Sequence, residues 1–180
     1  MKIYIALFRG INVVGKNRLP MKELKALLED IGAADVRTYI QSGNAVFRSA
    51  ENDASRLARK IGAAVKERHG FEPFVLLLEA RDLEKVISGN PFPEAAAVPN
   101  TLHLIFLTGA PKKGALESLE NLKSKSERFK LKGRLFYLHA PEGIGRSKLV
   151  AGLERAFGVL TTARNWRTVT AVRDMIQTGP

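Results

Sequence analysis

The feature that most constrains the fold is an internal match between the two halves of the chain. Residues 39–47 read YIQSGNAVF and residues 129–137 read FKLKGRLFY. In both stretches a turn glycine separates two short β-prone runs, which is the pattern of a β-hairpin. The two glycines, Gly43 and Gly133, lie 90 positions apart in a chain of 180 residues. Similarity at a fixed spacing indicates a repeated structural unit, so we expect two units of one topology.

The first half contains six elements before a change of pattern. A nearly continuous apolar run predicts a buried strand, and apolar residues at i, i+3, i+4 and i+7 predict an amphipathic helix that opens at Pro20. Asp53 is expected to cap a second helix, which Gly70 ends. The predicted elements are a strand at 2–8, a helix at 20–31, strands at 36–41 and 44–48, a helix at 54–69 and a strand at 71–78.

The same order returns after a short helix and the proline-rich connector at 90–99. The predicted elements are a strand at 102–107, a helix at 116–122, strands at 128–132 and 134–138, a helix at 149–157, a strand at 159–163 and a last helix from Thr168. The order βαββαβ is that of a ferredoxin-like unit. The sequence therefore predicts an α+β protein of two ferredoxin-like halves, 1–90 and 91–180, with mostly antiparallel sheets and an added C-terminal helix.

Composition narrows the classes of partner. The net charge is +11, and such a field attracts an anionic small molecule or nucleic acid. There is no cysteine, which fits a cytoplasmic location and excludes disulfides and thiolate metal sites. No apolar run is long enough to span a bilayer, so no membrane partner is expected. The sequence does not determine the oligomeric state.

The loop after the first strand has the sequence GINVVGKN at 10–17, close to the phosphate-loop pattern that ends in Gly-Lys-Ser/Thr. Asn17 stands where that pattern has the hydroxyl residue that binds Mg²⁺, and Pro20 places the helix start four residues beyond Lys16. We therefore do not expect a phosphate loop. The loop still carries many hydrogen-bond donors, which favour either a ligand loop or a β-to-α connection whose polar groups satisfy its own backbone.

Two further helix starts carry cations where the helix dipole is already positive. One is Arg146-Ser147-Lys148, and the other is the stretch 164–167, Arg-Asn-Trp-Arg. A bound anion would relieve this arrangement, although chance placement in a basic protein would also produce it. Trp166, the single tryptophan, could stack on a base, but packing of the last helix against the core is the favoured interpretation.

Other functional patterns are weak. The stretch 123–134 is basic on one strand face, but 132–137 matches the aromatic signature of RNA-recognition modules only in part. A solvated basic face is therefore favoured. His69, His103 and His139 are scattered and have no acidic or histidine neighbour at metal-ligand spacing, so neither a metal nor a cofactor is predicted. No nucleophile motif is present, and whether the protein is an enzyme stays open.

Several stretches together resemble one bacterial family. ALFRGINVVGKNRLPMKELKALLEDIG, VRTYIQSGNAVF, EGIGRSKL and ARNWRTVT are similar, in the same order, to the widespread family catalogued as domain of unknown function (DUF) 1697. The resemblance implies an α/β fold of two related ferredoxin-like halves and implies no catalytic residues. Val14 stands where that family usually has glycine, which narrows the conformations open to the loop.

We expect a protein that binds an anionic, phosphate-bearing ligand such as a nucleotide or a nucleic acid backbone. One alternative is an enzyme that acts on a small phosphorylated or carboxylated metabolite in the cleft between the halves, and another is a structural or partner-binding protein. The candidate ligand-binding residues are Arg9, Asn12, Lys16, Asn17, Gln41, Asn44, Arg146, Ser147, Lys148, Arg164, Asn165, Trp166 and Arg167.

Overall fold

The computed structural model describes residues 1–13 and 15–178, so the expectation about Val14 lies outside the described residues. The chain divides into two compact units. The first comprises Met1–Ser88 and the C-terminal stretch from Thr170, and the second comprises Gly89–Val169. The sequence-based division at residue 90 assigned the whole last helix to the second half.

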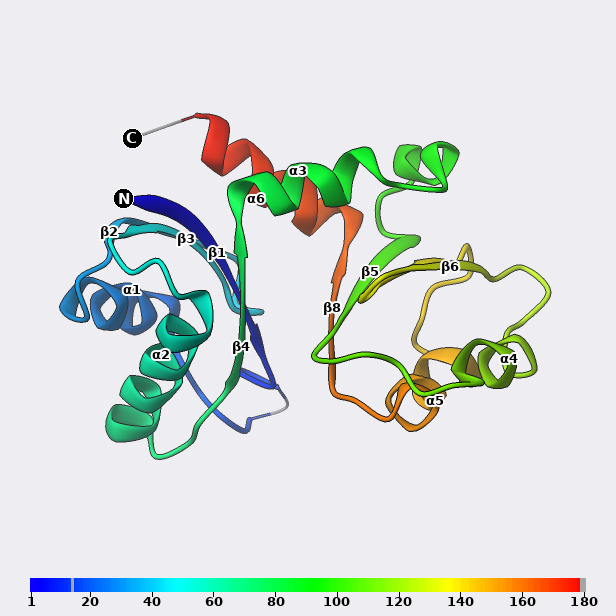
Figure 1. The fold of residues 1–180 in the computed structure, drawn as a ribbon, viewed down its shortest axis with the longest axis horizontal. Coiled ribbons are helices and arrows are strands. Elements are labelled where there is room, and N and C mark those ends of the chain that lie inside the picture. Colours follow the sequence, from blue (N-terminus) through cyan, green and yellow to red (C-terminus); the bar gives the residue numbers. More distant parts are fainter. Residues whose placement is uncertain (14, 179–180) are drawn as a thin grey trace. The chain divides into compact units, whose positions relative to one another are not determined.

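The first unit has the element order expected from the sequence. Its elements are β1 Lys2–Arg9, α1 Met21–Asp30, β2 Ala34–Tyr39, β3 Asn44–Ser49, α2 Ala54–His69, β4 Phe74–Glu79 and α3 Ala80–Ser88. The strand order in the sheet is β2-β3-β1-β4, and every neighbouring pair is antiparallel. This is the ferredoxin-like arrangement, and α1 and α2 cover the same face of the sheet (Figure 1).

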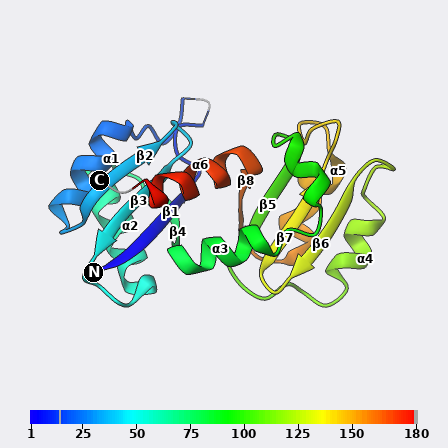
Figure 2. The same ribbon diagram turned by 90° about the horizontal axis from the view of Figure 1, so that it is seen from above.

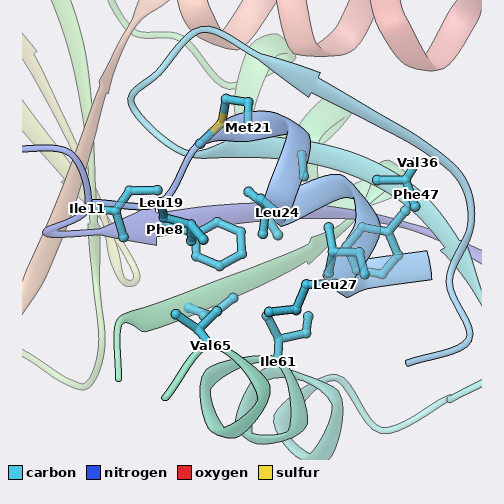
Figure 3. Packing of buried hydrophobic residues seen from close by; sticks show 14 of the residues in the cluster. Phe8, Ile11, Leu19, Met21, Leu24, Leu27, Val36, Phe47, Ile61 and Val65 are labelled. Atoms are coloured by element: carbon cyan, nitrogen blue, oxygen red, sulfur yellow. The ribbon is translucent and has the colours of Figure 1, made fainter. Parts of the chain in front are cut away.

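The core of the first unit lies between that sheet and its two helices. Phe8 of β1, Leu24 and Leu27 of α1, and Ile61 and Val65 of α2 meet in one buried cluster (Figure 3). Each such side chain contributes about 1.5–3 kcal/mol when it leaves water. The apolar faces of the two helices therefore pack against the inward-facing side chains of β1 on one side of the sheet.

Local signals set the helix ends as predicted. Pro20 is the N-cap of α1, so the loop lysine Lys16 lies outside that helix. The Asp53 carboxylate accepts hydrogen bonds from the backbone amides of Ser55 and Arg56 at the start of α2. These bonds, above all the one from Arg56, lower the pKa of Asp53. Gly70 ends α2 in the left-handed conformation.

The second unit repeats this topology. Its elements are the 3-10 helix Pro93–Ala97, β5 Leu102–Leu107, α4 Ala115–Glu120, β6 Arg128–Lys132, β7 Leu135–His139, α5 Lys148–Phe157 and β8 Thr161–Asn165, and α6 spans Trp166–Gln177. The strand order β6-β7-β5-β8 is equivalent to that of the first sheet, and β5, β7 and β6 lie side by side in Figure 2. The predicted fold class is thus confirmed.

Two boundaries near the C-terminus differ from the predicted ones. The last strand is displaced toward the C-terminus because Gly158 ends α5 in the left-handed conformation and the next two residues make the turn. The last helix begins at Trp166 rather than Thr168. Asn165 marks its start, since its side-chain oxygen accepts a hydrogen bond from the Thr168 amide at 3.0 Å.

Close packing in the second unit brings α5 against the chain that follows α4. A Cβ atom added to Gly152 would lie 2.6 Å from Cδ1 of Leu122. In the same unit the Phe136 ring packs between those of Phe129 and Phe157, with ring centroids 4.9 and 5.3 Å away, respectively. None of the helices in the described part of the chain combines the length and hydrophobicity that a bilayer crossing needs.

Candidate anion-binding site

The predicted ligand residues form three separate groups along the fold. The first group lies in the loop after β1 and in the β2–β3 turn, the second at the start of α5, and the third where β8 passes into α6. The groups differ in whether their polar atoms already have partners within the protein.

In the first group, the Asn12 side chain holds the loop together. Its amide nitrogen donates to the carbonyl oxygens of Leu19 and Gln41, at 2.9 and 2.8 Å, and its oxygen accepts from the Leu19 amide at 2.8 Å. All of these contacts are internal. The sequence alternative of a connection that satisfies its own backbone thus describes Asn12, and a ligand role for it stays a prediction.

Two more asparagines of this group also serve the backbone. The Asn17 side chain donates to the Gly10 carbonyl at 2.8 Å. Asn44 is fully buried and donates to the Tyr39 carbonyl and to Ser42 Oγ, both at 3.1 Å. Lys16 is exposed, and its backbone amide donates to the Val13 carbonyl at 2.9 Å. Arg9, at the end of β1, is partly buried and already interacts with another group of the protein.

Most residues of the third group, where β8 passes into α6, also have partners within the protein. Asn165 caps α6, and Trp166 is only 8% exposed, which agrees with the packing interpretation. Arg164 Nη1 donates to the Ala163 carbonyl at 2.7 Å and to Thr162 Oγ1 at 3.2 Å. Burial lowers the pKa of Arg164 to about 10. Arg167 is exposed but has an interaction within the protein.

The second group lies in an open pocket of about 820 Å³ at the start of α5. Its walls come from the end of α4, the turn before β6 and the loop before α5. The lining residues are Asn121, Leu122, Lys123, Ser124, Ser126, Glu127, Glu142, Gly143, Gly145, Arg146, Ser147 and Lys148. The sequence analysis identified three of them, Arg146, Ser147 and Lys148, and the fold places these beside Lys123.

The start of α5 combines first-turn backbone amides with nearby cationic side chains. Ser147 is the N-cap of α5, and its Oγ accepts from the Val150 amide at 3.1 Å. The first-turn amides of Lys148 and Leu149 have no acceptor within the helix, as at every helix N-terminus. No acidic residue lies in the first turn. The positive end of the helix dipole and the adjacent cations would therefore both attract an anion.

The charged side chains around the pocket differ in whether they already have partners within the protein. Within residues 1–13 and 15–178, the side chains of Arg146 and Lys148 have no ion-pair partner, whereas Lys123 pairs with Glu120. Two carboxylates also line the pocket, and both already accept hydrogen bonds. Glu127 accepts from the Ser124 amide at 2.8 Å, and Glu142 accepts from Ser126 Oγ at 2.7 Å. The net balance of the lining is one positive charge, from three cations and two anions.

The equivalent helix of the first unit shows the opposite choice of charge. There α2 starts with Asp53, a carboxylate that satisfies two helix amides. In the second unit α5 starts with a neutral serine between two cations. Because the two helices occupy the same topological position, the contrast cannot come from the fold and comes from the residues at these two starts.

The sequence did not predict that Lys123 lines the pocket at the start of α5, or that Gly152 makes a close contact next to it. Lys123 lies 23 positions before Arg146 in the sequence, and no local pattern joins the two. The signal for Gly152 was present, since a glycine inside a strongly amphipathic helix usually marks a close contact. That contact is with Leu122, which lines the pocket next to Lys123.

The basic face of β6 does not form an RNA-recognition surface. Arg128, Lys130 and Lys132 are exposed on one face, as their alternation predicts. The aromatic residues Phe106 and Tyr137 belong to the same face of the sheet by strand register, but they are 6% and 1% exposed. Base stacking requires exposed rings, so these two rings are not available for it, and the solvated basic face stays a prediction.

The histidines lie in different surroundings. His69 is 3.6 Å from Glu23, and His139 lies next to Arg128. His103 is buried, and its Nε2 atom has no hydrogen-bond partner within the described residues. No three histidine, aspartate or glutamate side chains in that part of the chain come together as potential metal ligands.

Comparison with known proteins places the chain in a family. The model of a family described as a protein of unknown function, DUF1697, matches residues 1–137. The chain belongs to the DUF1697 family. A solved structure, that of the conserved bacterial protein SP0830 from Streptococcus pneumoniae, is similar to it over 97% of this chain and 98% of the other, with a TM-score of 0.73 and 24% sequence identity. That similarity shows a shared fold. No curated protein matches the chain.

Proposed function

We propose that this DUF1697 protein binds a phosphate-bearing anion, such as a nucleotide or a nucleic acid backbone, at the start of α5. The observation that carries the proposal is the pair Arg146 and Lys148, which have no ion-pair partner among the described residues and flank the N-cap of a ten-residue helix. A phosphate group at this position would accept from the free first-turn amides and be attracted by both side chains. A cytoplasmic location goes with this proposal.

The state of the nearby cations supports this location over the starts of α1 and α6. At α1 the N-cap is Pro20, Lys16 lies four residues before it, and the Asn12 and Asn17 side chains bond to the loop itself. At α6 the Asn165 side chain caps the helix as Ser147 caps α5, but both flanking arginines, Arg164 and Arg167, already have interactions within the protein. At α5, Ser147 engages only the amide of Val150, which leaves room for a ligand oxygen at the earlier amides.

Binding can be tested with inorganic phosphate, pyrophosphate, ATP and single-stranded DNA, each titrated at several salt concentrations by calorimetry. The test variant is the double substitution Arg146→Gln, Lys148→Gln. The control variant is Lys113→Gln, Lys130→Gln, which removes the same charge from exposed positions outside the pocket. We expect the test variant to weaken binding by about three- to thirtyfold, since each of the two helix-end charges is worth about 0.3–1 kcal/mol.

The control separates a site from a general field effect. If both double variants weaken binding equally, only the net charge matters and the site is not at α5. If none of the four probes binds wild-type protein at low salt, the proposal of a phosphate ligand fails. A steep salt dependence seen with DNA but not with ATP would favour the nucleic acid backbone as the ligand.

A further inference from the structure

A cluster outside the pocket ties the segment after α3 to the second sheet. At its centre is Arg128, the first residue of β6. Its Nη2 atom donates to Glu94 Oε1 in the 3-10 helix and lies 3.0 Å from His139 Nδ1 in β7. Its guanidinium carbon lies 5.0 Å from the centre of the Phe92 ring. One side chain thus contacts two residues of the connector and one of the sheet.

Other contacts hold the same connector in place. Lys132, at the far end of β6, donates to the Gly89 carbonyl at 2.6 Å. The Asn90 side chain accepts from the Phe92 amide at 2.9 Å, which fixes the turn that presents the Phe92 ring. Residues 89–97 are therefore attached to β6 at two positions, and the Arg128 attachment is the one that also involves a histidine.

The contact with His139 constrains the state of that ring. Arg128 can only donate, so His139 Nδ1 must be the acceptor, and the proton of the neutral ring lies on Nε2. Arg128 and His139 are directly opposite in the register of β6 and β7. On the other side, Leu102 of β5 pairs with His139 and carries no charge. The charged groups that face His139 are thus Arg128 and Glu94, while Lys130 lies opposite Tyr137.

We propose that protonation of His139 displaces Arg128 from Glu94 and Phe92 and so frees the connector 89–97 from the edge of the second sheet. A protonated Nδ1 cannot accept from the guanidinium and places a like charge directly opposite it across the strands. The exposed Arg128 side chain can turn into solvent, whereas the His139 ring is partly buried beside Phe92, 6.2 Å away. Arg128 is therefore the group that moves.

The electrostatics of the resting state agree with this assignment. Burial, followed by the charge of Arg128, lowers the pKa of His139, while the charge of Glu94 opposes this. The Arg128 hydrogen bond also lowers the pKa of Glu94, which favours the ionised carboxylate. Release would therefore follow the uptake of one proton by the His139 side chain, at a pH below the ordinary range for histidine.

The test compares amide hydrogen exchange of the full chain at pH 7.5 and at a lower pH where an NMR titration shows His139 to be protonated, with both rates corrected for intrinsic exchange. In wild-type protein we expect the protection of residues 89–97 to fall about two- to fivefold as His139 takes up its proton, the range for loss of one exposed charged pair. His139→Phe keeps a ring beside Phe92 and should abolish this pH dependence. Arg128→Gln should raise the pKa of His139 and loosen the connector at both pH values.

Four outcomes would overturn the proposal. In the first, protection of the connector stays constant while His139 titrates. This would mean that Glu94 pairs with the imidazolium and that the segment stays attached. The pH dependence persists in His139→Phe. Or Lys130→Gln, which removes a neighbouring cation outside the cluster, changes the profile as much as Arg128→Gln does. A loss of protection throughout the second unit would indicate global unfolding and also contradict local release.

Discussion

Gly43 in the β2–β3 turn and Ile11 in the loop after β1 lie in direct contact. A Cβ atom at Gly43 would be 2.6 Å from Cδ1 of Ile11 and 2.7 Å from Cβ of Phe8. The backbone of Gly43 has a φ of 78°, in the region that favours glycine. Two separate requirements, conformation and space, therefore select glycine here.

The equivalent turn in the second unit provides a matched pair for a stability prediction. Gly133 also has positive φ, at 60°, but no atom lies within 4 Å of its added Cβ. We expect Gly133→Ala to lower the free energy of unfolding by about 1–2 kcal/mol, from conformation alone. Gly43→Ala should cost roughly 1–3 kcal/mol more, because the methyl group overpacks Ile11 and Phe8. Urea denaturation of both variants measures the difference, and equal losses would show that the loop yields freely.

A second prediction concerns the two loop asparagines. Asn12→Ala removes three hydrogen bonds that join Leu19 and Gln41, so we expect a loss of about 2 kcal/mol in the free energy of unfolding. Asn17→Ala removes one exposed bond to Gly10 and should cost about 1 kcal/mol or less. If Asn12→Ala is as mild as Asn17→Ala in denaturation experiments, the internal role assigned to Asn12 is wrong.

The third prediction makes the start of α5 resemble that of α2. Ser147→Asp would supply a carboxylate between Arg146 and Lys148, as Asp53 does for α2. We expect an increase of about 0.5 kcal/mol in the free energy of unfolding and weaker binding of inorganic phosphate, since the new carboxylate competes for the same groups. Ser147→Ala should instead destabilise by about 1 kcal/mol through loss of the cap. Unchanged phosphate binding in Ser147→Asp would argue against the proposed location.

A fourth prediction concerns stability in acid. Burial lowers the pKa of His103 below its ordinary value of 6.5. The unfolded chain therefore binds a proton near pH 6.5, before the folded chain does. The free energy of unfolding should be constant with respect to this group above that pH and should fall below it, by at most about 1.4 kcal/mol per pH unit.

His103→Leu isolates this contribution. The variant leaves the Asn100 backbone without its partner, so its stability at neutral pH is not the measurement. The measurement is the slope of unfolding free energy between pH 7 and pH 5, which should be smaller than in wild type. His139→Phe is the comparison, because that ring is more exposed and should contribute less to the slope. An unchanged slope in His103→Leu would assign the acid sensitivity to other groups.

The sequence predicted the contacts of the candidate polar residues less well than it predicted the elements. It identified Arg146, Ser147 and Lys148 because their position at a helix start can be inferred from periodicity. The loop residues Asn12 and Asn44 have the same polar composition as a ligand site, yet the structure gives their side chains internal partners. Composition does not distinguish a donor that awaits a ligand from one that already serves a backbone carbonyl.

Amino-acid sequence alone determined the order of helices and strands, the repeated topology and most helix ends. These features depend on interactions within a few residues, such as the Asp53 cap or the left-handed glycine at Gly70. Tertiary structure decided what each charged or polar side chain contacts. Lys123 joins the α5 pocket and Arg128 holds Glu94 only after distant segments meet. The energy of a charge depends on which groups surround it in space, and that is set by the completed fold.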